Sequence, residues 1–273
     1  MLKERLLTAA ILLPLFLGLM FFAPNPVWGA VLGIATAAAA VEWARLCGLK
    51  LAAQAGFAAV VAGSGALWLA ASVVPAWQPP RLLILQAVLA LAVVFWVVAV
   101  PCWLYFGWRV SLRGTLLAAG WLVLVPAWLA VTLLQQTPLL LFVALSVVWL
   151  ADTAAYFVGR RFGRRKLAPR ISPGKTVEGL VGAYVLVMIY ALLVSILAQP
   201  AAAPADRVGL LVFALVLTTL SVAGDLFESW MKRQSGVKDS GHVLPGHGGI
   251  LDRIDSLTAA MPFAALYLAY NTR

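Results

Sequence analysis

Long apolar runs separated by short polar stretches dominate this chain. Most runs are about 20 residues long, which is the length of helix that crosses the hydrocarbon layer of a membrane. They lack the alternation of apolar and polar positions that a transmembrane strand needs. The pattern therefore predicts an all-α, polytopic transmembrane helix bundle. Nine spans are expected, near residues 6–23, 27–46, 51–73, 82–104, 114–134, 139–159, 177–198, 208–231 and 250–270.

Composition excludes an ordinary soluble domain. Of the 273 residues, 63% are hydrophobic and 11% are charged, whereas soluble domains have about 25% charged residues. We predict a single integral-membrane domain over residues 1–273. Within it, residues 1–140 are expected to form helices with a mainly structural or lipid-facing role. Residues 141–273 are expected to carry the functional helices and cytoplasmic loops.

The first half of the chain offers few polar positions. Small residues, such as those at 37–40 and 63–65, favour close helix packing. Glu42 lies near a predicted helix end, three residues before Arg45. This spacing predicts a local ion pair between the two side chains.

Basic residues are distributed unevenly over the loops. With a cytoplasmic N-terminus, 17 of the 20 Lys and Arg residues fall on the cytoplasmic side, and only Arg81, Arg207 and Arg273 fall outside. Membrane proteins concentrate Lys and Arg in cytoplasmic loops, so we predict that the N-terminus is cytoplasmic. The net charge of +10 suits an anionic lipid surface and anionic substrates. It does not indicate nucleic acid, because no basic helix or aromatic-bearing sheet accompanies it.

Polar chemistry is concentrated in residues 225–256. Five of the ten acidic residues of the chain and both histidines lie here, namely Asp225, Glu228, Asp239, Asp252, Asp255, His242 and His247. A spacing of three residues places Asp225 beside Glu228, and Asp252 beside Asp255, on one side of a helix. Between these pairs, glycines let backbone amides approach a ligand. Clustered carboxylates attract hard divalent cations such as Mg²⁺, so this stretch predicts a site for metal-bound phosphates.

A second polar stretch covers residues 152–179. It combines the intramembrane acid Asp152, a strongly basic loop, and the sequence Ser-Pro-Gly-Lys-Thr at 172–176, which we interpret as a turn that opens a helix. Lys175, the neighbouring hydroxyls and the amides at the helix start would bind phosphate oxygens. The nucleotide-binding P-loop also contains Gly-Lys-Thr. However, that motif needs glycine where this chain has Pro169, and it needs a parallel sheet, so we exclude it.

The run from residue 229 to 255 resembles the signature of the bacterial-type phosphatidate cytidylyltransferases, also called CDP-diacylglycerol synthases. The matching positions are Ser229, Lys232, Arg233, Lys238, Asp239, Gly241, Leu244, Pro245, His247, Gly248, Gly249, Asp252, Arg253, Ile254 and Asp255. So many fixed positions make the signature specific. Residues 152–179 resemble the second recurring motif of the same family.

The resemblance implies an enzyme of phospholipid biosynthesis in the bacterial inner membrane, with its active site facing the cytoplasm. Phosphatidate would attack the α-phosphorus of CTP, expelling pyrophosphate and giving CDP-diacylglycerol. The implied cofactor is Mg²⁺, with a second cation left open, and the implied metal ligands and catalytic groups are Asp225, Asp252 and Asp255. Asp239 and Lys238 are further catalytic candidates. Expected phosphate-binding residues are Ser172, Lys175, Thr176, Lys232, Arg233, His247, Gly248, Gly249 and Arg253. Membrane lipid is an expected partner, and a homodimer is left open.

Two other classes of protein fit the sequence less well. A secondary transporter also uses intramembrane acids, but near the middle of the bilayer, whereas these acids lie at predicted cytoplasmic helix ends. A zinc hydrolase would use His242 and His247. These residues do not form a helical i, i+4 pair, and the Lys-rich surroundings would compete for charge.

Overall fold

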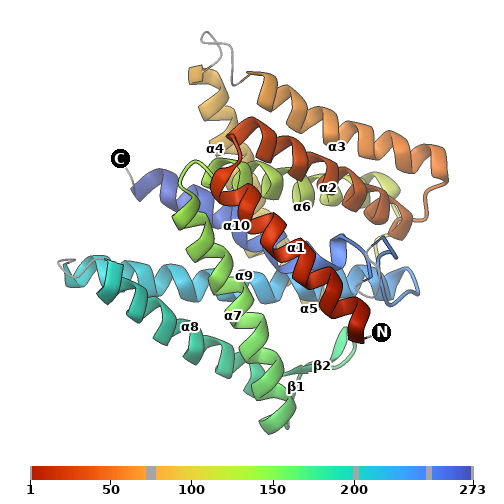
Figure 1. The fold of residues 1–273 in the computed structure, drawn as a ribbon. Helices are drawn as coiled ribbons and strands as arrows, with labels where there is room; N and C mark the ends of the chain where they lie inside the picture. Colours follow the sequence, from red (N-terminus) through yellow and green to blue (C-terminus); the bar gives the residue numbers. More distant parts are fainter. Residues whose placement is uncertain (1, 72–77, 199–202, 244–247, 272–273) are drawn as a thin grey trace.

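The computed structural model describes residues 2–71, 78–198, 203–243 and 248–271, which form a helical bundle (Figure 1). The helices are α1 (Leu2–Phe22), α2 (Asn25–Leu46), α3 (Leu51–Ala71), α4 (Gln78–Val94), the π-helical turn η2 (Phe95–Ala99), α5 (Val100–Phe106), α6 (Arg113–Leu134), α7 (Pro138–Phe162), α8 (Val177–Ala198), α9 (Pro204–Gln234) and α10 (Leu251–Asn271). Helices α4, η2 and α5 follow one another without a break. Long helical segments therefore lie at every position where an apolar run predicted one.

Within the described part of the chain, seven helical segments are long and apolar enough to cross a membrane. They cover residues 25–46, 51–71, 81–106, 113–134, 138–162, 177–197 and 206–234. The chain is thus an integral membrane protein with the predicted all-α polytopic bundle. Helix α1 adds a shorter apolar segment over residues 10–22. The number of spans and the side of the N-terminus stay predictions.

Helix α10 lies inside the bundle. It packs against α2, α4, α6, α7 and α9, and its small side chains Ala259, Ala260 and Ala264 are buried. Because neighbouring helices surround α10, its first turn can be polar without facing lipid. The helix begins beside the end of α9, which brings the two predicted acidic pairs close together.

Tryptophan side chains fix the packing of α2, α3 and α6. The ring of Trp128 occupies the space that a Cβ atom on Gly33 or Gly65 would need. Its Nε1 also donates a hydrogen bond to the carbonyl oxygen of Gly29 at 2.8 Å. The prediction of close packing is therefore confirmed at Gly65, whereas Gly63 has open space around it.

A two-stranded antiparallel hairpin is the main departure from the helical pattern. Strand β1 (Lys166–Ala168) pairs with β2 (Ser172–Thr176). The sequence interpretation of residues 172–176 as a turn is wrong, because they form a strand that runs directly into α8. Pro173 disfavours a helical conformation at the residue before it, and strand pairing satisfies backbone groups that a turn would expose. The carboxylate of Glu178 closes the hairpin by accepting a hydrogen bond from the backbone N–H of Arg164 at 3.0 Å.

The polar segments gather at one side of the bundle. The start of α1, the hairpin, and the loop that follows α9 lie together there, opposite the C-terminal end of α10 (Figure 1). The two stretches that carry the predicted chemistry are therefore neighbours in space.

Candidate active site

Helix α9 supplies one wall of the site, and its buried face determines which residues point into it. Phe227 is buried among the rings of Trp43, Phe95, Trp96 and Trp103, at centroid distances from 5.3 to 6.1 Å. Aromatic contacts of this kind hold a helix in one rotation about its axis. The polar positions of α9 on the other face therefore point toward the hairpin and the start of α10.

A polar cavity of about 890 Å³ lies between α7, the hairpin, α9 and the start of α10. Its lining includes most of the predicted site residues: Ser172, Lys175, Thr176, Asp225, Lys232, Arg233, Lys238, Asp239, Asp252, Arg253 and Asp255. The two predicted stretches thus form one site. Gly248 and Gly249 are not part of the lining, and His247 lies outside the described residues.

Lys175 and Asp225 form the direct link between the two stretches. The Nζ atom of Lys175 lies 2.6 Å from Oδ2 of Asp225, and the two side chains are 24% and 27% exposed. Ser229 donates a longer hydrogen bond of 3.4 Å to the other oxygen of Asp225. Because the ion pair is partly open to the cavity, a phosphate oxygen can reach the lysine.

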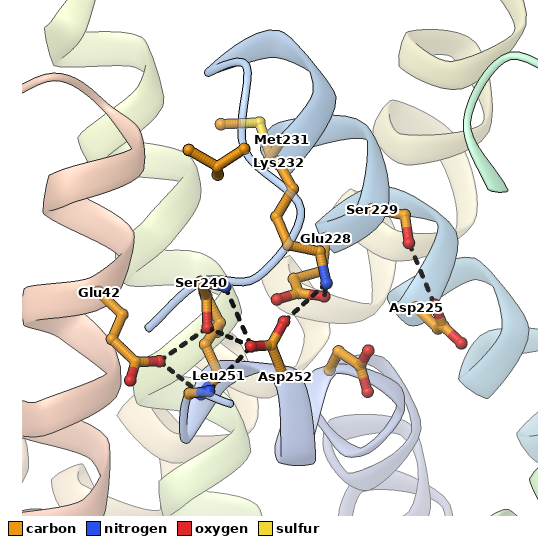
Figure 2. A network of polar contacts seen from close by, with 12 residues as sticks. Glu42, Asp225, Glu228, Ser229, Met231, Lys232, Ser240, Leu251 and Asp252 are labelled. Carbon is orange, nitrogen blue, oxygen red and sulfur yellow. Dashed lines mark hydrogen bonds and ion pairs between the residues drawn. The ribbon is translucent and has the colours of Figure 1, made fainter. Parts of the chain in front are cut away.

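Lys232 connects α9 to α10 (Figure 2). Its ammonium group lies 2.6 Å from Oε2 of Glu228 and 2.7 Å from Oδ1 of Asp252. All three side chains are largely buried, and removing one partner of such a group leaves an uncompensated charge. We predicted that Lys232 binds phosphate. That contact stays a prediction, since the ammonium group already neutralises two carboxylates.

Both carboxylate oxygens of Asp252 already have hydrogen-bond or ion-pair partners in the protein, whereas a carboxylate that is free to bind a metal would have an open oxygen. Its Oδ2 atom accepts hydrogen bonds from the backbone N–H of Ser240 at 3.0 Å, from the Ser240 hydroxyl at 3.0 Å, and from the backbone N–H of Gly249 at 2.9 Å. With Lys232 on its other oxygen, Asp252 holds the loop onto the start of α10. Gly248 has a φ of +85° in this loop, a conformation that favours glycine.

Asp152, Asp225 and Asp255 face the same cavity from α7, α9 and α10. The charges of Asp152 and Asp225 both act on Asp255, and Lys175 is close enough to Asp152 to offset part of the repulsion. Three carboxylates in one cavity repel one another unless a cation or proton neutralises them. The donor chemistry therefore fits a hard divalent cation.

The described residues contain no group of three or more His, Cys, Asp or Glu side chains already arranged as a metal site. The predicted ligand set of Asp225, Asp252 and Asp255 thus stays a prediction. The geometry adds Asp152 as a donor that sequence reasoning noted only as an intramembrane acid. Asp152 lies on α7, whereas the predicted ligands lie on α9 and α10, so the local sequence gave no signal that it would join them.

Residues of the hairpin and the cavity mouth have mixed roles. The Thr176 hydroxyl is buried and accepts a hydrogen bond from the backbone N–H of Gly179 at 3.1 Å, so it caps α8. Arg233 donates to the backbone carbonyl of Ile171 at 3.3 Å and ties the hairpin to α9. Lys238, Asp239 and Arg253 are exposed at the mouth. The predicted phosphate contact of Arg253 and the predicted catalytic roles of Lys238 and Asp239 remain predictions.

Glu42 was missed as part of the site, and its predicted ion pair with Arg45 is wrong. Arg45 is exposed, whereas Glu42 is only 1% exposed and accepts hydrogen bonds from Ser240, Ile250 and Leu251. A buried carboxylate needs such partners. They lie about 200 residues further along the chain, so the local spacing could not identify them.

A family profile and a bacterial relative each match almost the whole length of the chain. The profile described as "Cytidylyltransferase family" matches residues 3–271. This chain belongs to the cytidylyltransferase family. A phosphatidate cytidylyltransferase of Pseudomonas aeruginosa is 43% identical over 289 residues, which cover 98% of each chain.

Two further relatives of this cytidylyltransferase-family chain align over about half its length. The phosphatidate cytidylyltransferase of Haemophilus influenzae is 47% identical over 130 residues, or 47% of this chain and 45% of its own. That of Bacillus subtilis is 48% identical over 129 residues, or 47% of each chain. The family assignment agrees with the signature at residues 229–255.

A second cavity of about 890 Å³ lies beside the first in this family member. It is bounded by the end of α5, the hairpin and α9, and it shares Leu167 and Arg233 with the polar cavity. Its lining combines aromatic side chains, such as Tyr105 and Trp230, with three arginines. Apolar surface beside several guanidinium groups suits a molecule with an anionic head and a hydrocarbon tail.

Proposed function

We propose that this chain transfers the cytidylyl group of CTP to phosphatidate, giving CDP-diacylglycerol and pyrophosphate. The observation that carries the proposal is the single polar cavity in which acids from three helices meet Lys175, Arg233, Lys238 and Arg253. A site that brings a triphosphate and a phosphate monoester together needs this mixture of metal-binding and cationic groups. The similarity to phosphatidate cytidylyltransferases supports the same substrates.

The reaction needs no covalent intermediate on the protein. An oxygen of the phosphatidate phosphate forms a bond to the α-phosphorus of CTP, while the bond from that phosphorus to the bridging oxygen of the β-phosphate breaks. Pyrophosphate leaves with the electron pair. The nucleophile is already an anion, so the main obstacle is repulsion between two negatively charged substrates. Positioned cations reduce that repulsion and stabilise the charge that develops on the leaving group.

Lys175 is the residue we expect to contact phosphate most directly. In the structure its ammonium group is held by Asp225 at the centre of the cavity wall. A phosphate oxygen can share or replace that carboxylate, because the pair is partly exposed. Lys238 and Arg253 lie at the mouth, where they would attract the triphosphate of CTP from the cytosol.

We further propose Mg²⁺ as the cofactor, held by Asp225 and Asp255. Asp152 faces the same cavity and is a third candidate donor, whereas Asp252 already receives four hydrogen bonds or ion-pair contacts. When bound, Mg²⁺ would supply positive charge that offsets the negative charge of the substrate phosphates and of the leaving pyrophosphate. The repulsion among these carboxylates supports the proposal.

The second cavity would accommodate the lipid substrate. Its three arginines, Arg109, Arg170 and Arg233, suit the phosphate of phosphatidate, and its aromatic and aliphatic lining suits the glycerol and first acyl carbons. Leu167 and Arg233 belong to both cavities, so a lipid phosphate could pass from one to the other beneath the hairpin. CTP would enter the polar cavity from its mouth.

The side of the membrane follows from the loop charges. The 17 basic residues assigned to one side include those of the hairpin and the cavity mouth, which supports an active site facing the cytoplasm. A bacterial inner membrane fits this arrangement, since CTP is cytosolic and phosphatidate is a membrane lipid. The acids line the same cavity as the hairpin residues, an arrangement that does not favour a transporter, whose ion-binding acids lie midway across the bilayer.

Purified protein in detergent tests the proposed function. With phosphatidate, CTP and Mg²⁺ it should form CDP-diacylglycerol, and with diacylglycerol in place of phosphatidate it should not. A folded preparation that forms no CDP-lipid from phosphatidate would rule out the proposed reaction.

A further inference from the structure

We propose that Glu42 of α2 is a positioning residue that fixes the start of α10 and, through it, Asp252 and Asp255. The structural part of this inference is independent of the reaction. Its effect on turnover rests on the proposed function. Glu42 lies in the half of the chain to which the sequence gave a mainly structural role.

The contacts of Glu42 are made with Ser240, in the loop after α9, and with two residues at the start of α10 (Figure 2). Its Oε2 atom accepts a hydrogen bond from the Ser240 hydroxyl at 2.9 Å and from the backbone N–H of Leu251 at 2.8 Å. Its Oε1 atom accepts one from the backbone N–H of Ile250 at 3.0 Å. Three donors therefore satisfy a carboxylate that is almost fully buried.

These contacts make Glu42 the cap of α10. The first N–H groups of a helix have no partner within the helix, and the positive end of the helix dipole favours a negative charge there. A side chain next to the helix in sequence usually fills this role. Here the cap comes from α2, so the position of the α10 start depends on another helix.

Helix α2, which carries the capping residue, is held in place by its packing against α6. The indole Nε1 of Trp43, the residue after Glu42, donates a hydrogen bond to the backbone carbonyl of Leu116 on α6 at 2.9 Å. The same indole fills the space that a Cβ atom on Gly120 would need. Glu42 therefore lies next to a residue that is tightly packed against α6, which holds this part of α2 in place.

The Glu42 carboxylate also explains two glycines of the signature. A Cβ atom on Gly241 or on Gly249 would overlap this carboxylate. We predicted that Gly249 contacts substrate phosphates, but it is buried and its N–H is bound by Asp252. The space requirement of Glu42 therefore accounts for glycine at both positions without a ligand.

The same contacts reach the acidic residues of the site. The Ser240 oxygen lies 2.9 Å from Glu42 and 3.0 Å from Asp252, and its single hydrogen can serve only one carboxylate at a time. Asp252 and Asp255 both lie in the first turns of α10. A shift of the helix start would move both residues relative to Asp225, and misplacement by about 1 Å can reduce turnover by about a hundredfold.

Replacing Glu42 with Gln tests the role. The change keeps the size of the side chain but removes its charge and turns one acceptor into a donor, so at least one of the three hydrogen bonds is lost. We expect faster hydrogen–deuterium exchange in residues 248–256, measured without substrates. We also expect kcat to fall by about tenfold or more, with KM for CTP changed by less than about threefold.

Gln135→Glu is the matched control. Gln135 is a buried residue whose Nε2 donates to the backbone carbonyls of Met20 and Ala23, at 3.2 and 2.9 Å. Its Oε1 accepts a hydrogen bond from Asn25 at the start of α2, and Asn25 lies about 25 Å from Glu42 along that helix. This variant should lose thermal stability but keep the wild-type kcat and the wild-type exchange at 248–256.

The outcomes separate this inference from the proposed function. Wild-type exchange at 248–256 in Glu42→Gln would overturn the capping role whether or not the protein makes CDP-diacylglycerol. If exchange is altered but kcat falls equally in Glu42→Gln and Gln135→Glu, Glu42 stabilises the fold in general and does not position the site.

A second variant is available if Glu42→Gln does not fold. Ser240→Ala removes only the hydroxyl that links Glu42 to Asp252. It should lower kcat by several-fold in a protein that still folds, and an unchanged kcat would contradict the link.

Discussion

Lys175 of the hairpin and Asp225 of α9 form an ion pair of 2.6 Å at the wall of the polar cavity. This contact joins the two polar stretches that the sequence distinguishes, and it brings the candidate phosphate ligand to the candidate metal ligand. The ion pair places the Lys175 ammonium group at the cavity wall, whereas an exposed loop residue such as Arg164 does not line the cavity.

Replacing Lys175 with Ala should therefore reduce turnover strongly and raise the CTP concentration needed for half-maximal rate. We expect a loss of about a hundredfold in kcat/KM, comparable to removing one charged contact to the reacting phosphates. Arg164→Ala is the control, because the Arg164 side chain is exposed and does not line the cavity, so its charge is screened by solvent. Steady-state kinetics showing equal losses in the two variants would argue against a phosphate-binding role for Lys175.

The acids of the site should all be needed for activity but should differ in their effect on stability. Asp225→Asn, Asp252→Asn and Asp255→Asn are each expected to lower activity by at least about a hundredfold. Asp252→Asn should also lower the melting temperature, because it leaves the buried Lys232 with one carboxylate fewer. Asp225→Asn should affect stability less, since its ion pair is partly exposed.

Asp206→Asn is the control for these variants. Asp206 is an exposed acid in the first turn of α9, at the far end of that helix from the site. It should keep wild-type activity and melting temperature. Near-normal activity in both Asp225→Asn and Asp255→Asn would contradict the proposed metal-binding role of these two acids.

The helices and the main acidic cluster could be predicted because both depend on local sequence. An apolar run of sufficient length forms a helix wherever it lies in a membrane protein, and three-residue spacing places Asp225 and Glu228 on one face. The partners of each side chain could not be predicted in the same way. Lys232 looks like a phosphate ligand by composition, but Glu228 on the same helix and Asp252 on α10 both pair with its ammonium group.

Long-range contacts account for the remaining differences. Glu42 resembles half of a local ion pair, yet its partners come from the other end of the chain. Asp152 joins Asp225 and Asp255 only because α7, α9 and α10 meet around the cavity. Residues 172–176 form a strand because β1 lies beside them, which a search for helix starts does not anticipate.

The metal requirement is tested by removing the cation. If repulsion among the carboxylates is relieved by Mg²⁺, the wild-type protein should be inactive in EDTA and should recover when Mg²⁺ is added in excess. Zn²⁺ should not restore activity, because it prefers nitrogen and sulfur ligands in a tetrahedral arrangement. Full activity in EDTA, after dialysis to remove bound cations, would contradict a catalytic metal.

Orientation in the membrane is tested by labelling single cysteines in intact cells. Because 17 of 20 basic residues lie on one side in the predicted topology, a reporter at residue 168 or 240 should be cytoplasmic. A reporter at residue 202 or at the C-terminus should be external. Cytoplasmic labelling at both 168 and the C-terminus would mean that one of the last three predicted spans does not cross the membrane.

The central claim is that the polar cavity joins phosphatidate to the α-phosphate of CTP. The most direct measurement follows two labels in parallel, with purified wild-type protein, phosphatidate and Mg²⁺. Label in the α-phosphate of CTP should appear in the lipid product, and label in the γ-phosphate should appear in pyrophosphate, with Asp225→Asn forming neither at a comparable rate. Transfer of the γ-label to lipid, or equal formation of CDP-diacylglycerol by wild type and Asp225→Asn, would contradict the account.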